Sequence, residues 1–110
     1  EADGRLTYTV LLELLDPELV KMQFQVAAMT VLGDPAAYFS RYPGRFISMH
    51  LQGVDLNDPA RAWKVAVGKD SLNWPQIFSA AKVGGLKNYF IELNWELTKE
   101  SVAYLKTVRI

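Results

Sequence analysis

The chain has 110 residues, 50% of them hydrophobic and 22% charged, and its formal net charge is zero. This composition is typical of a globular protein, and the length allows one domain spanning residues 1–110. The absence of cysteine excludes disulfides and thiolate chemistry. A nucleic-acid partner has no electrostatic support without a basic run, and no apolar run reaches the roughly 18 residues of a membrane span. We expect a cytoplasmic location, or a periplasmic or exported one if an upstream signal has been removed.

The first half of the sequence predicts a helix, a strand and a second helix. A mostly apolar helix is expected over Leu6–Leu15, and Asp16-Pro17 ends it. Apolar residues alternate over Leu19–Val26, which is the period of a strand. Asp34 and Pro35 then suit the N-cap and first position of a short helix, which ends at Pro43-Gly44.

The second half repeats the alternation of strand and helix. A second strand is predicted over Arg45–Leu51 and a third over Asn88–Leu93. Between them come a polar loop over Gln52–Ala62 and a short apolar segment over Trp63–Val67. A helix over Trp74–Lys82 follows, with Asn73 as its N-cap and two glycines after its end. A last helix is expected to begin with Thr98 as its cap.

Strands that alternate with helices of this length favour parallel βαβ units. The runs Phe46–Leu51 and Tyr89–Leu93 are almost continuously apolar, as in strands covered on both faces. Right-handed crossovers between successive parallel strands give either an open sheet or part of a barrel.

One polar residue interrupts each predicted strand late in its run, namely Gln25, His50 and Glu92. In parallel α/β folds, functional residues gather at the carboxyl ends of the strands, so we expect these three to lie together at one edge. Each also has a purely structural interpretation. His50 is then a hydrogen-bonded core residue, Gln25 bonds to the backbone, and Glu92 pairs with Lys82 or Lys87.

Histidine and glutamate together suit a divalent metal ion, although two ligands do not make a site. Serine-nucleophile and glycine-rich phosphate-loop motifs are absent from the sequence. Of the three tryptophans, Trp74 begins a helix and is expected to pack on the core. Trp63 and Trp95 are candidates for stacking on a sugar ring, and Trp95 follows the third strand directly.

Several segments resemble the sugar phosphate isomerase/epimerase family, the xylose-isomerase-like TIM barrels. Tyr42–Phe46 with Met49–Gln52 is similar to that family's "YPGRF…LHVKD", and Gly68 with Asn73–Lys82 is similar to its "GxGxxDWxxIFxAAK". Gly85–Glu92 is similar to "GVKHYFVE". The resemblance covers roughly residues 16–106 and implies an α/β fold in which the strands are the sixth, seventh and eighth of a (β/α)8 barrel. A complete barrel needs about 250 residues.

The resemblance also implies a site and a chemistry. The family binds one divalent metal (Mn, Mg, Co or Zn) through Glu, Asp, His and Glu, and it moves a proton or hydride on a sugar. His50 and Glu92 match the histidine and the last glutamate, as metal ligands and catalytic residues. Gln25 stands where the aspartate is expected, as a weaker ligand, and Asp70 replaces a glycine. The first glutamate of the family lies on a strand before these three.

We expect the chain to act on a small-molecule sugar, with Trp95, Gln52 and Asp55 in contact with it. The sequence predicts the C-terminal part of a metal-dependent sugar isomerase/epimerase, inactive by itself. The alternative is a truncated or degenerate half-barrel that binds a sugar or serves only as structure. In either case three strands cannot close a barrel. We therefore expect a homo-oligomer or a pairing with a missing N-terminal half.

Overall fold

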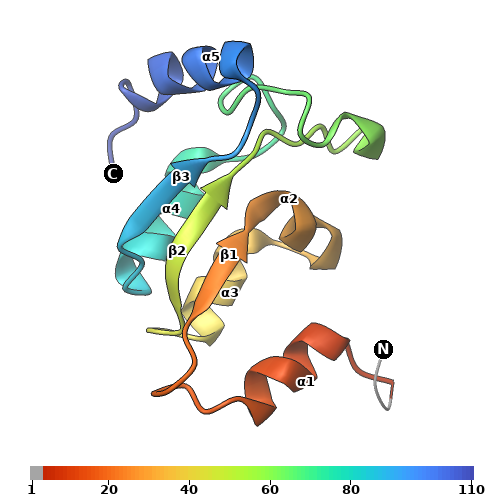
Figure 1. The fold of residues 1–110 in the computed structure, drawn as a ribbon, viewed down its shortest axis with the longest axis vertical. Helices are drawn as coiled ribbons and strands as arrows, with labels where there is room; N and C mark the ends of the chain where they lie inside the picture. Colours follow the sequence, from red (N-terminus) through yellow and green to blue (C-terminus); the bar gives the residue numbers. More distant parts are fainter. Residues whose placement is uncertain (1–3) are drawn as a thin grey trace.

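The computed structural model describes residues 4–110, which form an α/β fold around a three-stranded parallel sheet (Figure 1). The α-helices are α1 (Thr7–Leu14), α2 (Val26–Met29), α3 (Pro35–Arg41), α4 (Trp74–Val83) and α5 (Trp95–Leu105). The strands are β1 (Met22–Gln25), β2 (Phe46–Leu51) and β3 (Asn88–Ile91), and the short 3-10 helices are η1 (Thr30–Leu32) and η2 (Pro59–Arg61). No helix in the described part of the chain is long and apolar enough to cross a membrane.

The sheet has the order β1-β2-β3, so strands that follow each other in sequence lie side by side. The predicted parallel α/β arrangement is therefore confirmed. The first strand is shorter than predicted, because Leu19 lies exposed before it and Val26 already begins α2. Neither α2 nor η1 was predicted, since the alternating pattern gave no sign of where the strand ends.

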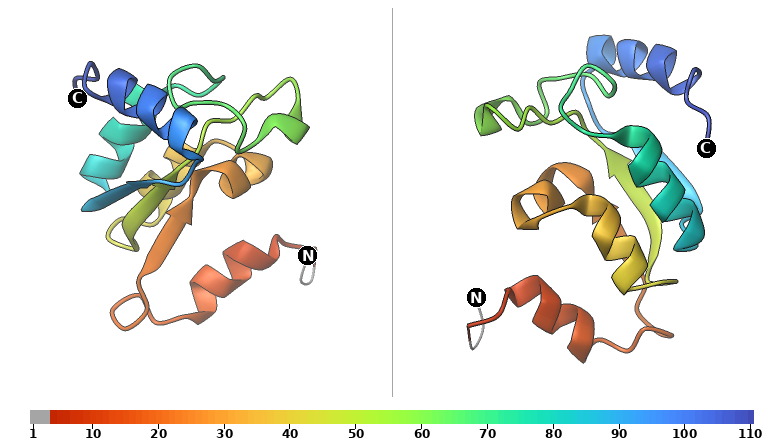
Figure 2. Two further views of the ribbon diagram at one scale, coloured as in Figure 1. Left: turned by 45° about the horizontal axis from the view of Figure 1, so that its top comes forward. Right: turned by 180° about the vertical axis from the view of Figure 1, so that it is seen from behind.

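Helices α3 and α4 cover one face of the sheet (Figure 2, right). Phe24, Met49 and Tyr89 form one row across the strands, and the first two are fully buried. Phe24 packs against Phe39 of α3 with ring centroids 4.7 Å apart, and Tyr89 meets Phe78 of α4 at 5.4 Å. Burial of these aromatic side chains is the main force that holds the helices on this face.

The opposite face of the sheet has no helix over it among the described residues (Figure 1). Because side chains alternate along a strand, this face carries the next row, Gln25, His50 and Phe90. Phe90 is 52% exposed. Parallel sheets are usually covered on both faces, so the uncovered, polar face is the unusual feature of this fold.

Arg45 joins α1 to the sheet. It is 4% exposed, and its guanidinium donates to the carbonyl oxygens of Leu12, Leu15 and Val20 at 2.8, 3.0 and 3.0 Å. Two of these carbonyls lie at the end of α1, where they have no partner within the helix and where the helix dipole favours a cation. The arginine thus satisfies the end of α1 and fixes the helix beside the sheet.

The helix caps agree with the sequence at α3 and α4 and differ at α5. Asp34 and Asn73 accept from the backbone N–H groups of Ala36 and Gln76, as predicted. The predicted cap Thr98 is wrong: α5 begins one turn earlier, with Asn94 accepting from Leu97 at 2.9 Å. Thr98 lies inside the helix, and its hydroxyl donates back to the Leu93 carbonyl oxygen.

The segment between β2 and α4 is held by hydrogen bonds to the partly buried side chain of Asp70. The Asp70 carboxylate accepts from the backbone N–H groups of Val54 and Gly68 at 3.1 and 3.0 Å and from the Trp74 indole at 2.8 Å. Burial raises the pKa of Asp70, and these three donors oppose the rise. Trp74 is fully buried, which confirms that it packs on the core.

Candidate functional site

The structure brings Gln25, His50 and Glu92 together at the carboxyl ends of the three strands, as predicted. Gln25 and His50 are register partners on β1 and β2. Glu92 directly follows β3, and its backbone N–H still donates to the Leu51 carbonyl oxygen at 3.1 Å. Parallel register therefore places the three side chains at one level of the sheet.

A single carboxylate oxygen is the centre of this cluster. Glu92 Oε2 accepts from Gln25 Nε2 at 2.9 Å and from Gln52 Nε2 at 2.6 Å, and His50 Nδ1 lies 2.9 Å away. His50 Nδ1 is also 3.0 Å from Gln25 Oε1. We call these four residues, Gln25, His50, Gln52 and Glu92, the strand-end cluster.

The cluster is partly open to solvent. The side chains of His50 and Glu92 are 28% and 44% exposed, and Glu92 Oε1 has no hydrogen-bond partner among the described residues. On its other side, the His50 ring meets the edge of Phe90, with centroids 6.3 Å apart and planes at 88°. A small polar molecule on the uncovered face could thus reach the imidazole and one carboxylate oxygen.

The structure does not contain the contacts that the purely structural interpretations of Gln25 and Glu92 require. Glu92 forms no ion pair with Lys82 or Lys87, and the Gln25 side chain bonds to Glu92 and His50 and not to the backbone. Both side chains serve the cluster.

Gln52 was predicted to contact a substrate, but it is fully buried. Its Oε1 accepts from the backbone N–H of Ala27 at 3.1 Å, while its Nε2 holds Glu92. Both the oxygen and the nitrogen of the Gln52 amide form hydrogen bonds within the protein, so this residue supports Glu92 from the buried side of the cluster. The prediction of direct contact with a substrate is not favoured by this burial.

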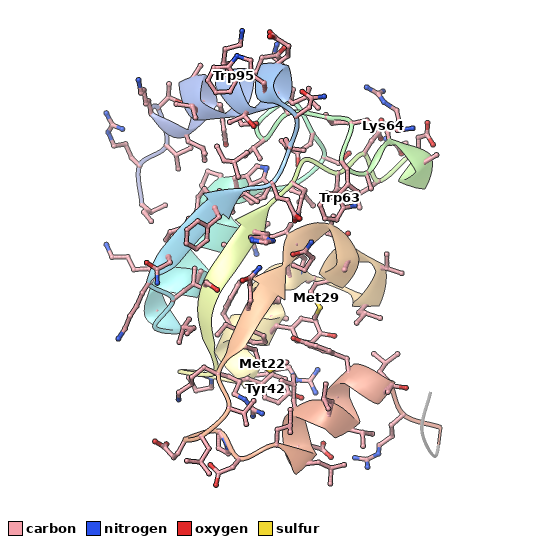
Figure 3. All side chains as sticks on the ribbon, in the orientation of Figure 1. Met22, Met29, Tyr42, Trp63, Lys64 and Trp95 are labelled. Atoms are coloured by element: carbon pink, nitrogen blue, oxygen red, sulfur yellow. The ribbon has the colours of Figure 1, made fainter. Side chains whose placement is uncertain are left out.

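The two other predicted substrate contacts lie outside the cluster. Asp55 accepts from the Asn57 N–H and pairs with Arg61 at 3.3 Å. Trp95 begins α5, 70% exposed, with Lys99 Nζ 5.7 Å from its ring centroid. Trp63 and Trp95 both lie toward the carboxyl end of the sheet, while Met22 and Tyr42 lie at the opposite end (Figure 3). Neither tryptophan forms a hydrogen bond to the cluster.

A pocket of about 300 Å³ lies between α2 and the loop after β2. Its lining includes Ala27, whose N–H holds Gln52, and it also includes Val54, Asp55 and Leu56. A second pocket of about 340 Å³ lies beside the first turns of α3 and α4. The first pocket is linked to the strand-end cluster through Ala27 alone, and none of the four cluster residues lines it.

The donor set in this chain does not fit a complete metal site. No group of three or more His, Cys, Asp or Glu side chains comes together within residues 4–110. The amide oxygen of Gln25 faces His50 Nδ1, and that of Gln52 accepts from Ala27, so neither is free to replace a missing ligand. His50 and Glu92 remain as the two candidate ligands.

Sequence reasoning missed the supporting role of Gln52 and the contact between Phe90 and His50. A usable signal was present, because Gln52 is two residues after His50, and alternate residues of a strand share one face. No protein-family model, no curated protein and no solved structure matches this chain.

Proposed function

We propose that this chain forms the C-terminal part of a TIM-barrel sugar isomerase/epimerase and that the strand-end cluster belongs to its active site. The single observation that carries the proposal is the convergence of Gln25, Gln52 and His50 on Glu92 at the carboxyl ends of parallel strands. Active sites of α/β barrels are built at this end of the strands.

The uncovered sheet face supports the barrel part of the proposal. In a barrel, helices cover the outer face and side chains of other strands fill the inside, so a piece with three strands has one face without helices. Here α3 and α4 lie on one face, and the row Gln25, His50 and Phe90 lies on the other. The outer edges of β1 and β3 have no strand partner within the described residues, so both could continue the sheet.

The chemistry follows from the atoms that are left open. An isomerase or epimerase takes a proton from a carbon next to a carbonyl group and returns it at another position or face, which a carboxylate or an imidazole can do. Glu92 Oε1 and the His50 ring are the open groups, and the two glutamines hold Glu92 Oε2 in place. A cluster whose members fix one another loses little entropy when a sugar binds.

A metal would need ligands from outside this chain. In the family that the sequence resembles, the ion polarises sugar oxygens, and this chain offers it His50 and Glu92. Divalent cations of this kind are held mainly by the number and charge of their oxygen ligands. Of these two residues, only Glu92 carries a negative charge, since a histidine ligand binds a metal in its neutral form. The chain therefore contributes one part of such a site.

Calorimetry tests this division. We expect Mn²⁺ or Mg²⁺ to bind the 110-residue chain with a dissociation constant above about 100 μM, because two ligands attract a divalent cation only weakly. Glu92→Gln should change the heats little, and the exposed Glu96→Gln serves as the matched control. Micromolar binding that is lost in Glu92→Gln but not in Glu96→Gln would mean that this chain holds a complete site.

A non-catalytic half-barrel is the second candidate. Its favouring observation is the amide of Gln25 at the position of the expected carboxylate, which removes one negative charge from the site. Such a relative would keep the uncovered face and the open strand edges for assembly with another chain, and it would bind a sugar without converting it.

A further inference from the structure

The orientation of the Gln25 amide is fixed by its neighbours. A carboxylate only accepts hydrogen bonds, so the 2.9 Å contact with Glu92 Oε2 requires the NH₂ group of Gln25 on that side. The reverse orientation would place two oxygens against each other. Gln25 Oε1 must therefore face His50 Nδ1, 3.0 Å away.

His50 Nδ1 consequently lies between two acceptors. Gln25 Oε1 and Glu92 Oε2 are both within 3.0 Å of this nitrogen. Without a hydrogen on Nδ1, its lone pair would repel both oxygens. The ring nitrogen that carries the proton is set by the hydrogen bonds that the ring makes, and here they select Nδ1–H. In the neutral ring, Nε2 then keeps a lone pair, and it has no partner among the described residues.

We infer that Gln25 is a positioning residue: together with Glu92 it holds His50 in the Nδ1–H tautomer, so that the lone pair of Nε2 stays open to a ligand. The ring contact with Phe90 limits rotation from the other side. The inference rests on the proposed function for the class of that ligand, a sugar or the metal ion that binds it. An aspartate, the residue expected here by resemblance, could also accept from Nδ1–H, but it has no N–H group to donate to Glu92 as the Gln25 amide does.

Nitrogen NMR of the imidazole tests the inference, because His50 is the only histidine of the chain. In protein with ¹⁵N-labelled histidine at alkaline pH, long-range ¹H–¹⁵N couplings distinguish the two tautomers. We expect Nδ1–H to exceed Nε2–H by about tenfold or more, the effect of one charge-assisted hydrogen bond. Gln25→Leu should lower this ratio severalfold, and Gln25→Leu combined with Glu92→Leu should make Nε2–H the major form.

Gln23→Leu is the matched control. Gln23 lies two residues earlier on the same strand and face, and among the described residues its side chain forms one hydrogen bond, accepted from Ser48 at 3.4 Å. This variant should leave the tautomer ratio unchanged. A majority of Nε2–H in the unmodified protein would overturn the inference, and so would a Gln25→Leu ratio equal to that of the unmodified protein. The measurement needs no substrate, so it gives its answer even if no sugar is converted.

Discussion

Arg45→Met is expected to lower the free energy of unfolding by about 3 kcal/mol, because it leaves one buried and two partly buried carbonyl groups without donors. The guanidinium is 4% exposed and donates to three carbonyl oxygens of Leu12, Leu15 and Val20. Methionine fills much of the same volume but can donate to none of them. Urea unfolding followed by circular dichroism measures the loss.

Arg5→Met is the control for removal of a cation near α1. Arg5 pairs with Glu13 at 2.6 Å, but both side chains are about half exposed, at 54% and 49%. Exposed ion pairs contribute at most about 1 kcal/mol. Equal losses in the two variants would show that Arg45 acts through charge alone and not through its buried carbonyl partners.

Gly53→Ala is expected to destabilise the fold by about 3 kcal/mol or more and to disturb the strand-end cluster. A Cβ atom at this position would lie 2.0 Å from the Val65 carbonyl oxygen and 2.6 Å from its carbonyl carbon. These are backbone atoms, so a side-chain rotation cannot relieve the contact, and the chain around residue 53 must move. Gln52 is the preceding residue, so its bonds to Ala27 and Glu92 should weaken.

The side-chain amide resonances of Gln52 report this displacement, and urea unfolding reports the stability. Gly84→Ala is the matched control. Its Cβ would come no closer than 3.1 Å to Phe39, and Gly84 has an ordinary helical conformation. We expect a change within about 1 kcal/mol there. A Gly53→Ala protein with native stability and unshifted Gln52 amides would refute the close approach of the two segments.

The sequence was sufficient for the elements that have local signals. Asp34-Pro35 and Asn73-Trp74-Pro75 mark helix starts through caps and proline, and the apolar run of Phe46–Leu51 marks the central strand. The position of Gln25, His50 and Glu92 at one edge of the sheet was also predictable, because the carboxyl ends of parallel strands lie at the same edge. These features depend on neighbours in sequence or on a general rule of the fold.

The remaining features depend on contacts between distant residues. Asn94 and Thr98 are both acceptable caps, and the choice follows from where β3 ends and α5 packs, including the buried Ser101 hydroxyl that accepts from Val67 at 2.9 Å. The buried state of Gln52 depends on Ala27, which is 25 residues away. Single-sequence patterns contain no information on such pairs, so the burial of Gln52 against Ala27 could not be predicted, although its spacing from His50 indicated a shared face.

Sugar conversion in D₂O tests the central claim most directly. The natural protein is incubated with Mn²⁺ and a panel of aldoses, ketoses and their phosphates, and products and deuterium are followed by NMR. We expect one sugar to be converted, with deuterium at carbon if a proton is exchanged and none if a hydride shifts. Glu92→Gln and His50→Gln should lower the rate by about a hundredfold or more, and Glu96→Gln should not. Conversion at an unchanged rate in Glu92→Gln, or no conversion of any sugar by the unmodified protein, would contradict the assignment of the strand-end cluster as the active site.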